Sequence, residues 1–265
     1  MKMTEPLPGF DPRTAFRLDG RVCLVTGAAR GIGRAVAFGA ARSGAAVHLL
    51  DRDAPAAAAV AAAITAEGGH AVAHRLDVTD EAQVVATLDA IAQGAGRIDA
   101  LVNNAGMALR RPAVELSRAE WDRVVDVNLT GVFLCARTAA RHMLAAGSGA
   151  IVNVASIMGL SGGGLYPNIS YQATKGAVVN LTRALAVEWA PLVRVNAVAP
   201  TWVRTGFIAP LLADPALVAR LEALMPLGRL AEADEIVGAV LFLLSPAGAM
   251  VTGHTLPVDG GYLAQ

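Results

Sequence analysis

The chain has 265 residues, of which 54% are hydrophobic, enough to bury the core of a single α/β domain. Its 22 basic and 22 acidic side chains cancel, so no overall positive field exists to hold nucleic acid or an anionic membrane. We therefore expect a neutral or mildly polar small-molecule ligand, and neither a nucleic-acid nor a membrane partner.

The N-terminus and the two cysteines indicate a reducing compartment. Lys2 is followed by prolines, without an apolar core or a small-residue cleavage site, so this segment does not resemble a signal peptide. Cys23 and Cys135 each lie in an apolar run, which favours buried reduced thiols over a disulfide. We expect a cytoplasmic protein in which residues 1–17 form a proline-containing N-terminal arm.

From residue 18 onward, short aliphatic runs alternate with Ala-rich segments of helical length. This is the pattern of βαβ units, and most runs lack polar alternation because parallel strands are covered on both faces. We predict one domain over 18–265 with a Rossmann-like, doubly wound α/β fold and a parallel seven-stranded sheet. The predicted strands are Val22–Thr26, Ala46–Leu50, Ala71–Leu76, Ala100–Val102, Ala150–Val154, Arg194–Ala197 and Thr255–Val258.

The first predicted strand runs into a glycine-rich turn that opens the first long helix. Glycines allow a tight turn and close backbone approach, and the helix N-terminus offers unpaired N–H groups to a pyrophosphate. A glycine-rich turn alone would be ordinary, but strand, turn and helix together favour phosphate binding. The residues of the turn are Thr26, Gly27, Ala28, Ala29, Arg30, Gly31, Ile32 and Gly33.

Asp51 follows the second predicted strand, 24 residues after Gly27, where a carboxylate can accept hydrogen bonds from the adenosine ribose hydroxyls. It would repel a 2′-phosphate, so NAD is favoured over NADP. Arg30 and Arg52 lie close in sequence and could weaken that rejection. The alternative for Asp51 is a solvated loop acid, or a cap of the helix predicted over Ala54–Ala66.

A long helix is predicted over Ser117–Ala146, and Ser117 with Glu120 forms a capping box at its start. Asn128 is unusual inside this helix, because its amide competes with backbone hydrogen bonds. A functional kink is one explanation, and an exposed helix asparagine is the other.

Ser156 follows the strand Ala150–Val154, at the sheet edge where ligands bind in open parallel sheets. A hydroxyl at this position can bind a carbonyl oxygen. The alternative is a turn serine before Gly159, and spacing alone does not exclude Ser161 or Ser170 for the same role.

Tyr171 and Lys175 stand four residues apart near the start of a helix predicted to run to about Trp189, so they share one face. A phenol is a poor base near neutral pH, and a neighbouring ammonium lowers its pKa toward the working range. Lys2 and Lys175 are the only lysines, which makes this one distinctive. By itself the pattern also fits a solvated helix face.

Ile236–Val258 contains no Asp, Glu, Lys or Arg. Its apolar part ends at Leu244, before Ser245 and Pro246, which is too short to span a bilayer. We predict a buried helix followed by a loop. The histidines show no metal-ligand spacing, and we expect no metal site; they are His48, His70, His74, His142 and His254.

Taken in order, these motifs resemble the short-chain dehydrogenase/reductase family over about residues 18 to 265. The resemblance rests on the glycine turn, Asn103-Asn104-Ala105-Gly106, Asn128, Ser156, Tyr171 with Lys175, and Val258-Asp259-Gly260-Gly261. It implies an enzyme that transfers hydride between a nicotinamide dinucleotide and a secondary alcohol or ketone.

The resemblance also assigns roles to single residues. It implies that Tyr171 is the general acid/base, that Lys175 lowers its pKa and binds the nicotinamide ribose, and that Ser156 orients the substrate oxygen. Asn128 would hold a water in the proton relay. The other implied cofactor contacts are Asp77 and Val78 at the adenine, Asn104, Ala105 and Gly106 along the cofactor, and Pro200, Val203 and Thr205 near the carboxamide and phosphates.

Two departures from the family pattern bear on the substrate. Pro200-Thr201 stands where the family often has Pro-Gly, so the backbone there is expected to differ slightly. The Ser156–Tyr171 interval, which contains Tyr166-Pro167-Asn168, is a little longer than in many members and is similar to that of the sugar-alcohol dehydrogenase branch. That branch implies NAD-linked oxidation of a polyol, sugar alcohol or vicinal diol.

Specificity is expected in the loops Met107–Pro112, Ser156–Asn168 and Thr201–Arg229. Leucines in the last of these should form a lid with an apolar inner face, namely Leu211, Leu212, Leu217, Leu221 and Leu224. An NAD(P)H-dependent ketoreductase acting on 3-oxoacyl thioesters or hydrophobic ketones, and a non-catalytic dinucleotide-binding regulator, remain alternatives.

The resemblance finally implies a homo-oligomer, a dimer or a tetramer. Family assemblies pack the helices containing Asn128 and Tyr171 between subunits. Phe133, Cys135 and Val187 would be suitable apolar contacts, although a monomer core would use them equally.

Overall fold

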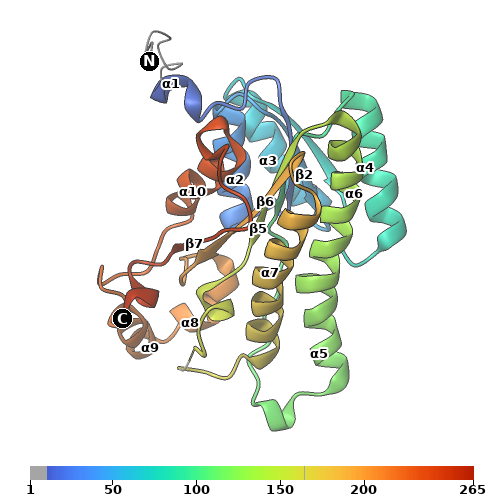
Figure 1. Cartoon of the computed structure of the whole chain (residues 1–265). Coiled ribbons are helices and arrows are strands. Elements are labelled where there is room, and N and C mark those ends of the chain that lie inside the picture. Colours follow the sequence, from blue (N-terminus) through green and yellow to red (C-terminus); the bar gives the residue numbers. More distant parts are fainter. Residues whose placement is uncertain (1–10, 164) are drawn as a thin grey trace, which may run out of the picture.

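A computed structural model describes residues 11–163 and 165–265. Seven strands form one parallel sheet in the order β3-β2-β1-β4-β5-β6-β7 (Figure 1), which confirms the predicted doubly wound, Rossmann-like α/β fold. The strands are β1 Val22–Thr26, β2 Ala46–Asp51, β3 His70–Arg75, β4 Ala100–Asn103, β5 Gly149–Val154, β6 Val193–Pro200 and β7 Thr255–Val258. The predicted strand positions are therefore correct, with ends displaced by up to three residues.

Helices cover both faces of the sheet, with α2 and α10 on one side and α4, α6 and α7 on the other (Figure 1). The two layers enclose separate apolar cores, one with Val36 and Val240, the other with Leu88 and Met143. The helices are α1 Pro12–Ala15, α2 Gly31–Arg42, α3 Ala54–Ala66, α4 Glu81–Ala95, α5 Arg118–Val125, α6 Gly131–Ala146, α7 Ile169–Glu188, α8 Ala209–Leu212, α9 Pro215–Glu222 and α10 Asp234–Leu244.

The helix predicted over Ser117–Ala146 is interrupted. The capping box of Ser117 and Glu120 starts α5 as expected, but Asp126–Thr130 form a π-helical turn between α5 and α6. Asn128 lies in this turn and is fully buried, so it marks a kink and is not an exposed helix asparagine.

Both cysteines are free, and burial raises the pKa of each thiol to about 12. This confirms the expected buried thiols. It also corrects the suggestion that Cys135 contacts a neighbouring subunit, because its side chain is inside the core between α6 and the sheet. Phe133 and Val187 do reach the surface.

The predicted N-terminal arm is described only from Asp11, which caps α1, and residues 1–10 lie outside the described part. Leu18, the first residue of the predicted domain, is fully buried and joins the core. The charge-free segment Ile236–Val258 contains most of α10 followed by a loop, as expected. In the described residues no helix is both long and apolar enough to cross a membrane.

Candidate active site

A cavity of about 580 Å³ opens at the carboxyl edge of the sheet, where the loops after the strands converge. This is the position at which open parallel sheets bind ligands. Because Ser156 follows β5 while Asp51 ends β2, the cavity extends across several strands. We call the part around Ser156, Tyr171 and Lys175 the catalytic end, and the part around Asp51 and Asp77 the distal end.

Most of the residues predicted to bind a cofactor or a substrate line this cavity. Gly33 and Asn128 do not, and both lie behind its wall. The residues predicted from sequence that do line it are Gly27, Arg30, Gly31, Ile32, Asp51, Asp77, Val78, Asn104, Ala105, Gly106, Ser156, Tyr171, Lys175, Pro200, Val203 and Thr205.

The glycine turn has the shape that a pyrophosphate requires. Gly27 and Gly31 have φ of 63° and 54°, in the left-handed region, and Gly31 faces Thr205 across the cavity so closely that a Cβ would lie 3.3 Å from the Thr205 methyl group. Gly33 is needed for packing, because a Cβ there would lie 2.4 Å from the Asn104 amide nitrogen. The turn and the N-terminus of α2 therefore fit a dinucleotide phosphate.

Asn104 ties the β4 loop to the glycine turn. Its side-chain amide donates to the backbone carbonyl oxygens of Thr26 and Gly27, both at 3.0 Å. The Thr26 hydroxyl accepts from the backbone amides of Asn104 and Ala105, also at 3.0 Å. These bonds hold two walls of the cavity at a fixed separation.

At the distal end, Asp51 is buried and accepts hydrogen bonds at 3.0 Å from the backbone amides of Ala29 and Asp53. It is therefore neither a solvated loop acid nor the cap of α3, since that cap is Asp53. Asp77 accepts from the Thr79 amide and hydroxyl, and these bonds lower the pKa of its carboxyl. The side chains of two aspartates thus border the distal end.

Ser156, Tyr171 and Lys175 meet at the catalytic end. The Ser156 hydroxyl accepts from the Met158 amide at 3.1 Å and so caps a short turn, but it also lines the cavity. The turn packs directly on α7, since a Cβ on Gly159 would lie 2.6 Å from the Lys175 carbonyl carbon. Ser161 and Ser170, which spacing did not exclude, are outside the cavity wall.

Lys175 is almost completely buried. Its Nζ donates to the Val154 carbonyl at 2.6 Å and lies 5.6 Å from the centre of the Tyr171 ring. Burial lowers the pKa of Lys175 to about 8. One turn of α7 therefore places an ammonium beside the phenol, as the four-residue spacing predicted.

The predicted lowering of the Tyr171 pKa is not seen in the protein alone. Although the Tyr171 side chain is only half-buried, loss of water around its phenol raises the pKa to about 12, while Ser156 acts in the opposite direction. Burial also lowers the pKa of Lys175, to about 8, so its ammonium still predominates at neutral pH. In the protein alone the phenol is therefore neutral, with the Lys175 ammonium beside it.

Asn128 lies behind the wall of the catalytic end and links two of its segments through hydrogen bonds. Its amide oxygen accepts from the Met107 backbone at 2.8 Å, and its amide nitrogen donates to the Met107 carbonyl at 2.9 Å and to the Thr174 hydroxyl at 3.2 Å. These bonds join the loop after β4 to the residue before Lys175. The side chain thus has a structural role that the sequence did not indicate.

Six further residues line the substrate side of the catalytic end, and the sequence assigned none of them an individual role. They come from the three loops predicted to set specificity, and no local pattern relates positions in separate loops. They are Met107, Arg110, Tyr166, Asn168, Trp202 and Phe207.

The predicted lid is formed by α8 and α9. Leu211 and Leu221 are buried against Ile157 and Met158, while Leu212, Leu217 and Leu224 pack at the margin of the same cluster. The apolar inner face is therefore confirmed. Thr201, the departure from the usual glycine, is buried, and its backbone amide donates to the Val258 carbonyl at 3.1 Å.

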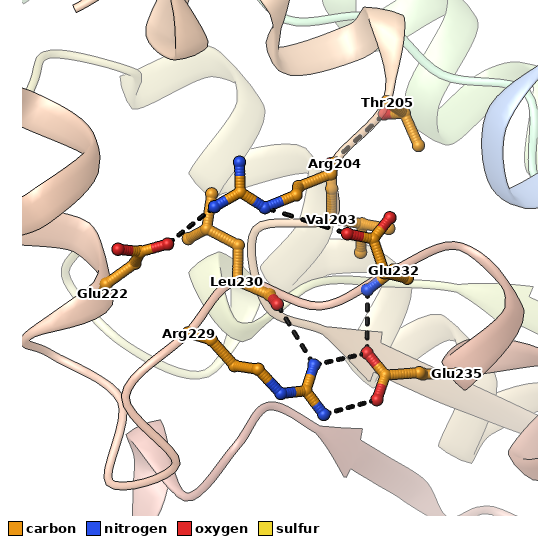
Figure 2. Close-up of polar contacts among 8 residues, drawn as sticks. All are labelled: Val203, Arg204, Thr205, Glu222, Arg229, Leu230, Glu232 and Glu235. Atoms are coloured by element: carbon orange, nitrogen blue, oxygen red, sulfur yellow. Dashed lines mark hydrogen bonds and ion pairs between the residues drawn. The ribbon is translucent and has the colours of Figure 1, made fainter. Parts of the chain in front are cut away.

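Ion pairs hold the two ends of the lid segment (Figure 2). Arg204 pairs with Glu222 of α9 at 2.6 Å and with Glu232 at 3.8 Å, and Arg229 pairs with Glu235 of α10 at 2.6 Å. We call these five residues the lid clasp. It closes a loop whose middle, α8 and α9, packs in one apolar cluster with Ile157 and Met158.

His48 and His74 form the most distinctive histidine contact. Their rings stack with centres 5.1 Å apart, and the two facing nitrogens are separated by 2.9 Å. Within residues 11–163 and 165–265, no three His, Cys, Asp or Glu side chains are placed to hold a metal ion.

Known proteins resemble this chain over most of its length. A family model described as "Enoyl-(Acyl carrier protein) reductase" matches residues 27–263. The cis-4-hydroxycyclohexanecarboxylate dehydrogenase of Sinomonas cyclohexanicum is 49% identical, covering 92% of this chain and 97% of that protein. The D-threitol dehydrogenase of Mycolicibacterium smegmatis is 46% identical, with coverage of 93% and 94%.

A solved structure gives the same picture. The gluconate 5-dehydrogenase of Burkholderia cenocepacia in complex with NADP and tartrate has a TM-score of 0.92 and 39% identity, covering 96% of this chain and 100% of that one. Together with the glycine turn, these likenesses support a dinucleotide cofactor. The chain belongs to the short-chain dehydrogenase/reductase family.

Proposed function

We propose that this protein interconverts a secondary alcohol and a ketone with NAD(H), its substrate being a polyol, sugar alcohol or vicinal diol. The observation that carries the proposal is the meeting of Ser156, Tyr171 and Lys175 at one end of a cavity whose glycine turn suits a dinucleotide. The names of the reported relatives support it, since each acts on a compound with a secondary hydroxyl group.

In this proposal Tyr171 takes the proton of the substrate hydroxyl during oxidation and returns it during reduction. The Ser156 hydroxyl donates to the substrate oxygen and fixes its position. Lys175 holds its ammonium near the phenol and binds the ribose hydroxyls of the cofactor. When bound, the oxidised nicotinamide supplies the hydride acceptor and a positive charge, which favours the ionised phenol.

We propose NAD as the preferred cofactor. Asp51 lines the distal end, and its carboxylate would repel the 2′-phosphate of NADP while accepting bonds from free ribose hydroxyls. Arg30 is drawn to Asp53, at 3.7 Å, which reduces its availability for a phosphate. Against this preference, the solved structure of the Burkholderia cenocepacia relative contains NADP.

A ketoreductase acting on hydrophobic ketones is the second candidate. The apolar cluster under the lid, with Ile157, Met158 and Leu211, offers a surface for such substrates. A cofactor-binding regulator without catalysis is disfavoured, because it would not need Tyr171 and Lys175 side by side in the cavity.

We also propose a cytoplasmic homo-oligomer. Phe133 is 39% exposed on α6 and Val187 is 81% exposed on α7, and these are the helices that family assemblies bury between subunits. The free thiols of Cys23 and Cys135 suit a reducing compartment.

The test is an absorbance assay for reduced nicotinamide with purified protein, each cofactor, and a panel of polyols, vicinal diols and cyclic secondary alcohols. We expect turnover with NAD and a secondary hydroxyl, and at least a tenfold loss in Ser156→Ala, since one positioned hydrogen-bond donor is worth roughly that factor or more. Turnover confined to NADPH and hydrophobic ketones would establish the second candidate in its place. Ser161→Ala, a serine outside the cavity wall, is the matched control.

A further inference from the structure

The catalytic end contains an arginine whose charge has no partner. Arg110, in the loop after β4, lines the cavity, and its Nε is buried without a hydrogen-bond partner. Among the described residues no carboxylate lies within ion-pair distance of its guanidinium, although Asp126 borders the same cavity. The neighbouring Arg111 differs, because it pairs with Glu120 at 3.1 Å and does not line the cavity.

The position of Arg110 is fixed by aromatic residues of the other two specificity loops. Its guanidinium carbon lies 5.5 Å from the centre of the Tyr166 ring, and the Tyr166 hydroxyl accepts a hydrogen bond from the Trp202 indole at 2.6 Å. All three residues line the cavity. A planar cation is thus held against a fixed ring, with its hydrogen-bond donors left for something that enters from solution.

A second unsatisfied group lies on the same wall. Asn168 is 5% exposed and lines the cavity, and its side-chain oxygen has no hydrogen-bond partner. Asn168 directly precedes α7, which carries Tyr171. A buried donor and a buried acceptor without partners, both at the catalytic end, are typical of a site that a polar ligand completes.

From these contacts we infer that the substrate carries a carboxylate, which Arg110 binds while Ser156 and Tyr171 hold the secondary hydroxyl. Asn168 would accept a bond from a further hydroxyl group. The substrate class is then a hydroxy acid, cyclic or polyhydroxylated, rather than a neutral polyol. This inference rests on the proposed dehydrogenase reaction, and it places a hydroxy acid where the proposed function has a neutral polyol or diol.

A carboxylate is the group that Arg110 suits best. Guanidinium and carboxylate are matched in geometry and charge, and their paired hydrogen bonds are strengthened where water is excluded. The cofactor does not fill this role, because its phosphates belong at the glycine turn and Thr205, whereas Arg110 neighbours Tyr166 and acts electrostatically on Tyr171.

The test compares cis-4-hydroxycyclohexanecarboxylate with its neutral carboxamide as substrates for NAD-linked oxidation. We expect the wild type to prefer the acid in kcat/KM, and the acid-to-amide ratio to fall by roughly 10- to 100-fold in Arg110→Gln, as loss of a charge-assisted pair predicts. Arg110→Lys should keep part of the preference. Arg111→Gln, the matched charge removal outside the cavity, should keep all of it.

Binding of cyclohexanecarboxylate, which has no hydroxyl to oxidise, separates this inference from the proposed function. Its dissociation constant, measured by calorimetry with NADH present, should rise in Arg110→Gln and stay unchanged in Arg111→Gln. Such a result would support the carboxylate site even if no alcohol were oxidised. Two results would overturn the inference. One is an equal loss of kcat/KM for acid and amide in Arg110→Gln, and the other is a wild type with the same kcat/KM for both substrates.

Discussion

Asp51 contributes both to the architecture of the cavity and to its charge. Its carboxylate fastens the glycine turn through the Ala29 amide, and it also borders the space where the adenosine ribose would lie. Replacing the Asp51 carboxylate should therefore let NADP bind more readily while the cavity keeps its shape.

We predict that Asp51→Ser lowers the ratio of kcat/KM for NAD to that for NADP by at least tenfold, about the factor expected from one lost charged hydrogen bond. Steady-state assays with both cofactors measure it. Asp80→Asn is the control, because Asp80 caps α4 without lining the cavity. An unchanged ratio in Asp51→Ser would remove the basis for assigning NAD.

The His48–His74 pair makes stability depend on pH. Burial is the main reason that the pKa of His48 falls to about 4 from its ordinary 6.5, and it also lowers the pKa of His74. Between pH 4 and 6.5 the unfolded chain therefore binds more protons than the folded one, because its histidines keep the ordinary pKa. Stability is therefore present above about pH 6.5 and is lost as the pH falls toward 4.

We predict that lowering the pH from 7.5 to 5 reduces the Tm by roughly 2–4 °C through this pair, after allowance for partial solvent screening. In His48→Gln the dependence over this range should be clearly shallower. Exposed His254→Gln is the control and should keep the wild-type slope. Thermal unfolding curves at several pH values measure this dependence. Equal slopes of Tm against pH in the wild type and both variants would contradict the prediction.

The residues that motifs identify were predictable from the sequence, and those that loops bring together were not. Tyr171 and Lys175 share a face because of helix geometry, so their contact follows from spacing. Arg110, Tyr166 and Trp202 come from three separate loops, and no local pattern relates their positions. The rise in the Tyr171 pKa also escaped prediction, because it comes from burial of the phenol, which spacing along a helix does not show.

At the scale of elements, the lid clasp anchors both ends of the segment that carries α8 and α9. The Arg204 backbone amide donates to the Ala231 carbonyl at 2.8 Å, so the two ends of the lid segment lie side by side. The Arg204–Glu222 pair then joins α9 to these ends (Figure 2). The clasp thus fixes α9, whose Leu221 packs in the apolar cluster with Ile157 and Met158.

We predict that Arg204→Gln raises the substrate KM by roughly two- to fivefold with a smaller change in kcat, the factor appropriate to a surface ion pair worth up to about 1 kcal/mol. High salt should produce the same shift in the wild type. Arg229→Gln removes an equal charge from the clasp but leaves α9 attached, so its KM should change less. Identical kinetics in all three proteins would exclude a role for the clasp in binding.

The interruption of the helix predicted over Ser117–Ala146 belongs to the same scale. An asparagine inside a helix allowed either a functional kink or an exposed side chain, and the sequence did not decide between them. The π-helical turn buries Asn128 so that its amide can bond Met107 and Thr174. Tertiary contacts, which local sequence does not encode, decide between an exposed and a buried asparagine.

At the scale of the whole molecule, the alternation of apolar runs and helical segments was sufficient to predict the parallel sheet. Strand ends were less predictable, and β6 extends to Pro200 because tertiary pairing with β7 continues beyond the aliphatic run. The sheet order places the ends of β1, β4 and β5 side by side, and this arrangement joins the glycine turn to Ser156 in a single cavity.

The central claim is that Tyr171 transfers the proton in a dinucleotide-linked oxidation, and Tyr171→Phe tests it most directly. The ring keeps its packing against Phe207, 5.9 Å away, so the Tm and the binding of NADH should be preserved. We predict that NAD-linked turnover of a secondary alcohol falls by roughly 10²- to 10⁴-fold, the usual contribution of a general acid/base. Turnover within about twofold of the wild type would contradict the account.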